Sequence, residues 1–79
     1  FREEKAETLT LEWLDIAFPQ LADRLNPLVK EKAQDARENL KDDLHTNMEI
    51  INMDGYEIQI GVNTFKEMFV LDIREPMYD

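Results

Sequence analysis

Two residues, Asp54-Gly55, constrain the fold of this chain more than any others, because they separate two apolar-rich runs within residues 48–62. Asp-Gly is one of the few dipeptides that accept positive φ at both central positions of a type I′ turn. A two-residue turn here predicts a β-hairpin in which Met53 lies opposite Tyr56. Because side chains alternate along a strand, the second strand then presents an apolar face. That face consists of Tyr56, Ile58, Ile60 and Val62.

The next apolar run, residues 65–73, predicts a third strand that extends the hairpin to an antiparallel meander. A two-residue turn at Asn63-Thr64 would place Phe69 opposite Ile58. A loop of about three to five residues is the alternative, because the β-branched Thr64 resists positive φ. The third strand is expected to end at Pro76, which has no amide hydrogen to donate. Its core-facing residues are expected to be Phe65, Phe69, Leu71 and Ile73.

The N-terminal half has helical periodicity, with apolar residues at spacings of three and four. The stripe is formed by Leu11, Leu14, Phe18, Leu21, Leu25 and Leu28 and widened by Trp13, Ile16, Ala17 and Ala22. We expect residues 1–7 to form a frayed terminus or a solvated first turn, and a first helix to run over about 9–18, with Thr8 or Thr10 as its N-cap. Pro19 should end or kink this helix. A short helical segment over 20–25 should follow.

A longer helix is predicted to begin at Asn26-Pro27, with Asn as the cap and Pro in the first turn, and to reach about Leu44. Its buried stripe is expected to be Val29, Ala33, Ala36, Leu40 and Leu44. Its solvated face is expected to be Lys30, Glu31, Asp35, Arg37, Glu38, Lys41 and Asp42. The sequence therefore predicts a single α+β domain over residues 1–79. In it, two to three N-terminal helices pack on one face of a three-stranded antiparallel meander.

The chain carries a formal net charge of −9, from 18 acidic and 9 basic residues. This charge repels nucleic acid and anionic membranes, so we expect neither as a direct partner. A protein partner, including one with a basic surface, is favoured instead. The absence of cysteine excludes a disulfide framework and a thiolate metal site. With no apolar run long enough to cross a membrane and no signal-peptide pattern, a cytoplasmic location is expected.

Paired carboxylates are the first catalytic possibility to weigh. In the predicted register, Glu49 and Glu67 flank Ile60, about 10 Å apart, an arrangement that could serve a hydrolase. No nucleophile, basic residue or glycine-rich loop accompanies them, so solvated carboxylates are the favoured interpretation. His45 is expected to interact with the dipole of the preceding helix end rather than to act in catalysis. We therefore predict no enzymatic activity, no cofactor and no metal.

The outward face of the predicted sheet points to an interface. Apolar residues from both outer strands surround Gln59 and Gly61 on this face: Met48, Ile50, Met68 and Val70. An uncovered patch of this kind is typical of binding surfaces, and Gly61 would admit another backbone. The alternative is that the N-terminal segment or a helix covers the face. The favoured function is a small acidic protein-binding or regulatory module, acting through a sheet face or edge and able to form a homodimer.

An acidic cluster near the C-terminus supports an alternative function. Asp72, Glu75 and Asp79 lie close in the sequence, and Glu57 is expected nearby. Such carboxylates could imitate DNA phosphates and block a nucleic-acid enzyme, as phage and mobile-element inhibitors do as a class. The predicted partner-binding residues are therefore Met48, Ile50, Gln59, Met68, Val70, Glu57, Asp72 and Glu75.

Overall fold

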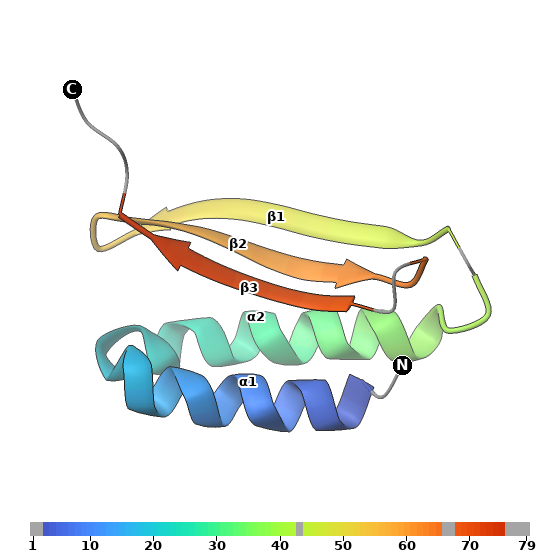
Figure 1. The fold of residues 1–79 in the computed structure, drawn as a ribbon, viewed down its shortest axis with the longest axis horizontal. Coiled ribbons are helices and arrows are strands. Elements are labelled where there is room, and N and C mark those ends of the chain that lie inside the picture. Colours follow the sequence, from blue (N-terminus) through green and yellow to red (C-terminus); the bar gives the residue numbers. More distant parts are fainter. Residues whose placement is uncertain (1–2, 43, 66–67, 76–79) are drawn as a thin grey trace.

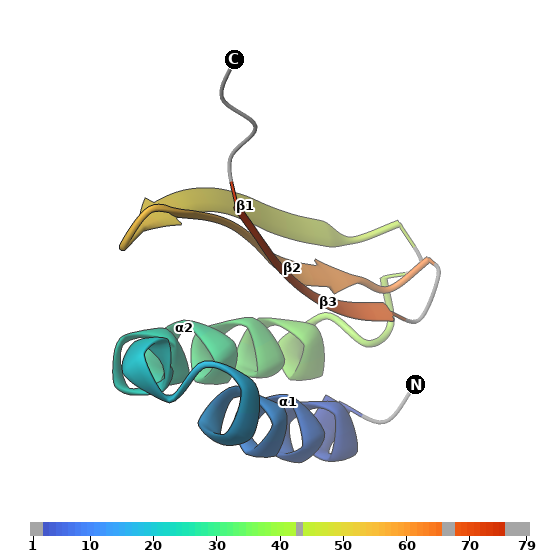
Figure 2. The same ribbon diagram turned by 60° about the vertical axis from the view of Figure 1, so that its left-hand side comes forward.

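The structure, a computed structural model, describes residues 3–42, 44–65 and 68–75. Two helices precede three strands in the order α1 (Glu3–Ala17), α2 (Pro19–Glu38), β1 (Thr46–Met53), β2 (Tyr56–Asn63) and β3 (Met68–Arg74). The strands form one antiparallel sheet in the order β1-β2-β3. Both helices lie on the same side of this sheet (Figures 1 and 2). The predicted α+β class and three-stranded meander are confirmed.

The β1–β2 hairpin has the predicted register, with Met53 opposite Tyr56 and Ile51 opposite Ile58. Asp54 has a φ of 53° and Gly55 a φ of 83°, the positive values that a type I′ turn requires. The guanidinium of Arg24 on α2 hydrogen-bonds the carboxylate of Asp54, with Nη1 donating to Oδ1 at 3.1 Å. This contact lowers the pKa of Asp54 and joins the turn to the helix layer.

The register of β3 differs from the one that a two-residue turn would give. Ile58 lies opposite Ile73 rather than Phe69, and Asn63 pairs with Met68, so the connection spans residues 64–67. This agrees with the longer-loop alternative. Because the shift is an even number of residues, the core face of β3 is preserved. Phe65 is the exception: it lies in the turn and is 66% exposed, so its predicted core position is wrong. Pro76 lies outside the described residues.

Helix α1 begins earlier than predicted, at Glu3, so residues 3–7 form helical turns, which agrees with the second alternative, and a frayed end over these residues is wrong. Thr8 and Thr10 are inside the helix rather than at its N-cap. Their hydroxyls donate to the carbonyl oxygens of the residues four positions earlier, at 3.0 and 2.6 Å. The predicted break at Pro19 is confirmed: α1 ends at Ala17, and Pro19 occupies the first turn of α2, where its missing N–H costs no hydrogen bond.

Helix α2 runs through Pro27 without a break, so the predicted boundary at Asn26-Pro27 is wrong. An interior proline costs about 3 kcal/mol, yet the fully buried Leu25 and Val29 on either side form one continuous face against the sheet. Burial of this face outweighs the lost hydrogen bond. The helix ends at Glu38 rather than near Leu44, and Leu40 and Leu44, which were predicted to be buried, are exposed.

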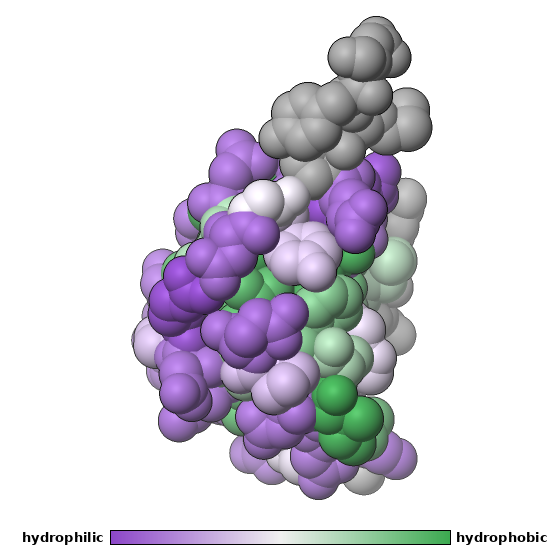
Figure 3. Space-filling view, turned by 90° about the vertical axis from the view of Figure 1, so that its left-hand side faces the viewer, coloured by the Kyte–Doolittle hydropathy of each residue, from purple (hydrophilic) through white to green (hydrophobic). Residues whose placement is uncertain are grey.

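The core lies between the two layers, with α2 against β2 and α1 against β3. Its buried apolar side chains are Leu14, Leu21, Ala22, Leu25, Val29, Ala33, Ala36, Ile58, Ile60 and Val62. Three aromatic rings continue this core toward one end of the molecule. The ring of Trp13 lies 5.6 Å from that of Phe18 with a tilt of 59° between them, and the Phe18 ring meets Tyr56 edge to face at 5.5 Å. Figure 3 views this end and shows apolar residues between the sheet and the helices, bordered by hydrophilic ones.

Candidate binding surfaces

Neither described helix covers the outward face of the sheet, since both lie on the opposite side (Figure 2). Cross-strand pairing places Met48, Gly61 and Val70 in one row, and Ile50, Gln59 and Asp72 in the next. Met48, Ile50 and Met68 are 37%, 64% and 45% exposed, and Val70 is half-buried. The structure therefore brings the predicted apolar residues together on one exposed surface, which we call the outer sheet face.

Gly61 has a different role from the one predicted. A Cβ at this position would lie 2.1 Å from the carbonyl oxygen of Asn47 and 2.7 Å from the Cα of Met48. Both atoms belong to β1. The backbone that approaches Gly61 is therefore the neighbouring strand of the same sheet, and Gly61 allows β1 to lie close to β2.

The predicted carboxylate array is partly neutralised. Arg74 lies opposite Glu57 and hydrogen-bonds the carboxylate of Asp72. The hydrogen bond to Asp72 raises the pKa of Arg74 above its ordinary value. Glu75 is exposed just beyond β3, and Asp79 lies outside the described residues. Within the described chain, the outer sheet face thus carries a guanidinium between its acidic groups.

The register that predicted Glu49 and Glu67 on either side of Ile60 is wrong. The residue of β3 opposite Ile60 is Leu71, which excludes the predicted register, and Glu67 itself lies outside the described residues. Glu49 contacts Lys32 of α2 instead, with the Lys32 Nζ 2.6 Å from its Oε1. Lys32 is 1% exposed, and its Nζ also donates to Asn47 Oδ1 at 2.8 Å.

These contacts belong to a polar cluster that joins α2 to β1. The cluster comprises Lys32, Asp35, His45, Asn47 and Glu49. The ring Nε2 of His45 lies 2.5 Å from Asp35 Oδ2, so His45 contacts a carboxylate in the last turn of α2. Burial acts to raise the pKa of Asp35, but hydrogen bonds from His45 and Asn47 outweigh it and hold that pKa below its usual value. The prediction that Asp35 is solvated is wrong.

Replacing Asp35 by asparagine should lower the free energy of unfolding at neutral pH by about 1 kcal/mol, since a charged hydrogen-bond acceptor becomes neutral. Because the folded-state pKa lies below the unfolded one, this stabilisation is present above about pH 4 and is lost as the pH falls through the folded-state pKa. Urea unfolding of both proteins at several pH values measures the effect. Their stabilities should converge in acid; a constant difference would contradict the assignment.

A groove between α1 and β3 was not predicted. It has a volume of about 230 Å³ and is lined by Leu9, Thr10, Trp13, Phe69 and Leu71. The sequence signal was the spacing of Leu9, Trp13 and Ile16, which forms a second apolar stripe beside the buried one. A helix with two such stripes carries more apolar surface than one sheet face can cover. Leu9, Trp13 and Ile16 are 54%, 44% and 83% exposed.

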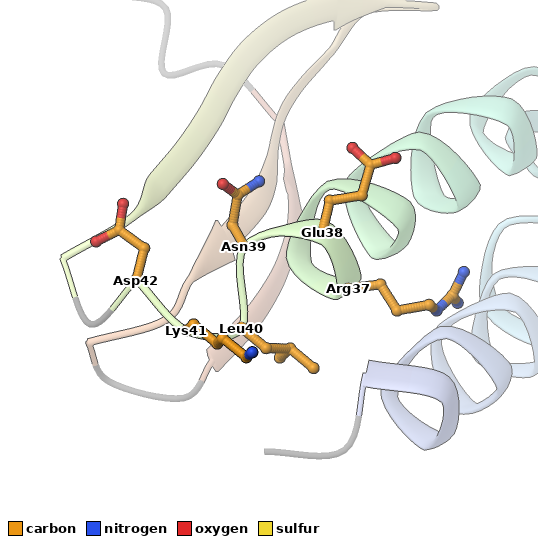
Figure 4. Close-up of a pocket in the computed structure, with 6 residues that line it drawn as sticks. All are labelled: Arg37, Glu38, Asn39, Leu40, Lys41 and Asp42. Atoms are coloured by element: carbon orange, nitrogen blue, oxygen red, sulfur yellow. The ribbon is translucent and has the colours of Figure 1, made fainter.

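A second hollow, of about 590 Å³, lies at the C-terminal end of α2 (Figure 4). Its lining comes from a single stretch of chain, residues 37–42. Arg37 in this stretch already contacts Glu7 of α1 at 3.3 Å. Figure 4 shows the side chains pointing apart rather than converging on one point. This hollow therefore presents no converging set of chemical groups.

Neither described helix is long and apolar enough to cross a membrane. Among residues 3–42, 44–65 and 68–75, no three His, Asp or Glu side chains are grouped so as to hold a metal ion. Comparison of the chain with protein-family models, with curated proteins and with solved structures gives no significant match.

Proposed function

We propose that this protein is a small, non-enzymatic protein-binding module and that the outer sheet face is its principal binding surface. The observation that carries this proposal is the exposure of Met48, Ile50 and Met68 beside Val70 on an uncovered sheet. Apolar side chains grouped on a surface lose contact with water when a partner covers them, which favours association. Methionine adds adaptability, because its unbranched side chain fits varied partner shapes.

The arrangement of acidic groups supports binding rather than catalysis. Glu49, one of the two predicted hydrolytic carboxylates, is engaged by Lys32. The half-buried acids of the outer sheet face, Glu57 and Asp72, lie beside Arg74. These contacts give the carboxylates structural roles. The net charge of −9 favours a partner whose surface is basic around an apolar centre.

The double substitution Ile50→Lys and Val70→Lys tests this function. We expect it to weaken self-association, or binding of a captured protein partner, by about 100-fold or more, because two apolar contacts are replaced by charges that must be desolvated. The matched control is Thr46→Lys with Asn52→Lys, which adds the same charge to polar positions of the same face. Light scattering at low and high salt reports the solution mass, and circular dichroism checks the fold.

Association through the outer sheet face should persist at high salt, because apolar contacts are not screened. An acidic inhibitor that imitates DNA, the alternative function, would lose binding steeply as salt is added. Binding that survives in the Ile50→Lys, Val70→Lys protein would contradict the proposed surface. Unfolding of this protein, with a folded control, would show instead that the face supports the core.

A further inference from the structure

The β3 strand is an edge of the sheet. It pairs with β2 on one side, and no described residue pairs with its other side. An edge strand presents backbone N–H and C=O groups that can pair with an added strand. The other edge, β1, differs in its surroundings: its core-facing Asn47 and Glu49 are occupied by Lys32. Only at β3 does a free edge of the described sheet border an apolar groove.

The groove has the spacing that an added strand requires. Phe69 and Leu71 of β3 line it from above, and Leu9 and Trp13 of α1 line it from below. α1 and β3 run in the same direction along the molecule (Figure 1). Leu9 and Trp13 are separated by about 6 Å along the helix axis, and alternate residues of a strand by about 6.6–6.8 Å. Successive inward side chains of a fourth strand would therefore meet Leu9 and then Trp13.

The acidic residues around the groove favour an added strand that carries basic side chains. Lys5 is the only basic residue of α1, and the exposed Glu12 lies one turn from Leu9 of the groove. Asp72 lies on the outer sheet face of β3, beside the outward positions of an added strand, where it already accepts a hydrogen bond from Arg74 of the same strand. Basic side chains at these positions would complement the net charge of −9. A second copy of the chain would bring the same acidic residues and is disfavoured.

We propose that the α1–β3 groove binds an extended peptide segment of alternating apolar and basic residues, which adds to the sheet as a fourth strand along β3. This inference rests on the proposed protein-binding function and specifies the chemistry of one class of partner. The apolar side chains of the segment enter the groove, and its lysines or arginines face outward. Backbone pairing with β3 gives affinity, and the groove selects the register.

The test uses synthetic peptides of alternating lysine and valine, about nine residues long. Trp13 is the only tryptophan of the chain and lines the groove, so its fluorescence reports binding directly. We expect saturable binding with a shift of emission to shorter wavelength. A peptide of the same composition with its lysines and valines in two blocks should bind at least about tenfold more weakly. Methylation of alternate backbone nitrogens, which removes the donors along one edge, should abolish binding.

Two matched substitutions on α1 locate the site. Leu9→Lys places a charge in the groove, whereas Ile16→Lys makes the same change on the same helix outside the groove lining. Both residues are more than half exposed, so both proteins should fold. We expect Leu9→Lys to weaken binding of the alternating peptide by about tenfold or more and Ile16→Lys by less than about twofold. If both proteins lost the same amount of peptide affinity, the peptide would be held by general attraction between its lysines and the acidic protein, and the proposal would be overturned.

Three further outcomes would overturn the groove proposal. One is a free protein that is dimeric and becomes monomeric with Leu9→Lys, since a second copy would then occupy the groove. Another is peptide binding that survives Leu9→Lys and is lost in the Ile50→Lys, Val70→Lys protein. That result would leave the proposed function intact and move the site to the outer sheet face. The third is no change in Trp13 fluorescence with any peptide.

Discussion

Replacing Gly61 by alanine is expected to destabilise the fold by about 3 kcal/mol or more. The added methyl group would lie 2.1 Å from the carbonyl oxygen of Asn47, which is a backbone atom that cannot rotate away. β1 must therefore move from β2, and the hydrogen bonds between them lengthen. Since small single-core domains are stable by only about 3–5 kcal/mol, much of the population should unfold. Urea unfolding followed by circular dichroism measures the loss.

Gly55 provides the matched control, because the same added methyl group would have no atom within 4 Å. Its φ of 83° is unfavourable for alanine, so Gly55→Ala should cost about 1–2 kcal/mol from backbone strain alone. The test is whether Gly61→Ala loses more free energy of unfolding than Gly55→Ala does. A Gly61→Ala protein as stable as the parent, or less affected than Gly55→Ala, would show that β1 accommodates the methyl group without losing its pairing.

Removing the carboxylate of Glu49 is expected to cost about 3 kcal/mol, whereas removing the charge of Lys32 should cost less than about 1 kcal/mol. Glu49→Ala leaves the Nζ of a lysine that is only 1% exposed with Asn47 as its remaining side-chain partner. Lys32→Met removes that buried charge and keeps a similar side-chain shape. The side chain of Glu49 is 43% exposed and can return to water.

Chemical unfolding of the two single variants and of the double variant tests this asymmetry. The double variant should lose much less free energy of unfolding than Glu49→Ala alone, because no buried charge remains. Glu49→Gln is the control that keeps an acceptor for Lys32 without the charge, and it should lie between the parent and Glu49→Ala. A Lys32→Met protein that is less stable than Glu49→Ala would mean that the ion pair, rather than the unpaired lysine, dominates the energetics.

The outer sheet face was predictable because its determinants are local. Asp54-Gly55 sets the hairpin register through the backbone conformation of two residues, and strict alternation then assigns Met48 and Ile50 to the outward side. The β3 register was not determined in the same way, since the Asn63-Thr64 region admits several loop lengths. The outward position of Met68 and Val70 was nevertheless correct, because an even shift leaves each residue on its face.

The groove and the polar cluster were not predictable, because each depends on residues far apart in the chain. Lys32 and Asp35 resemble solvated helix residues until β1 brings Asn47 and Glu49 over them. Trp13 resembles a core residue until the width of the sheet leaves it half uncovered. Helical periodicity shows that a side chain shares a face with its neighbours. It does not show how much of that face another layer will cover.

Some helix boundaries depend on local chemistry, and others depend on packing between distant residues. Turn chemistry and the missing amide hydrogen of Pro19 act within a few residues, so the sequence alone determined the hairpin and the break between α1 and α2. At Pro27 a local penalty of about 3 kcal/mol competes with burial of Leu25 and Val29 against the sheet. Only packing in three dimensions sets the size of that burial, which is why the continuous α2 emerged from the tertiary structure.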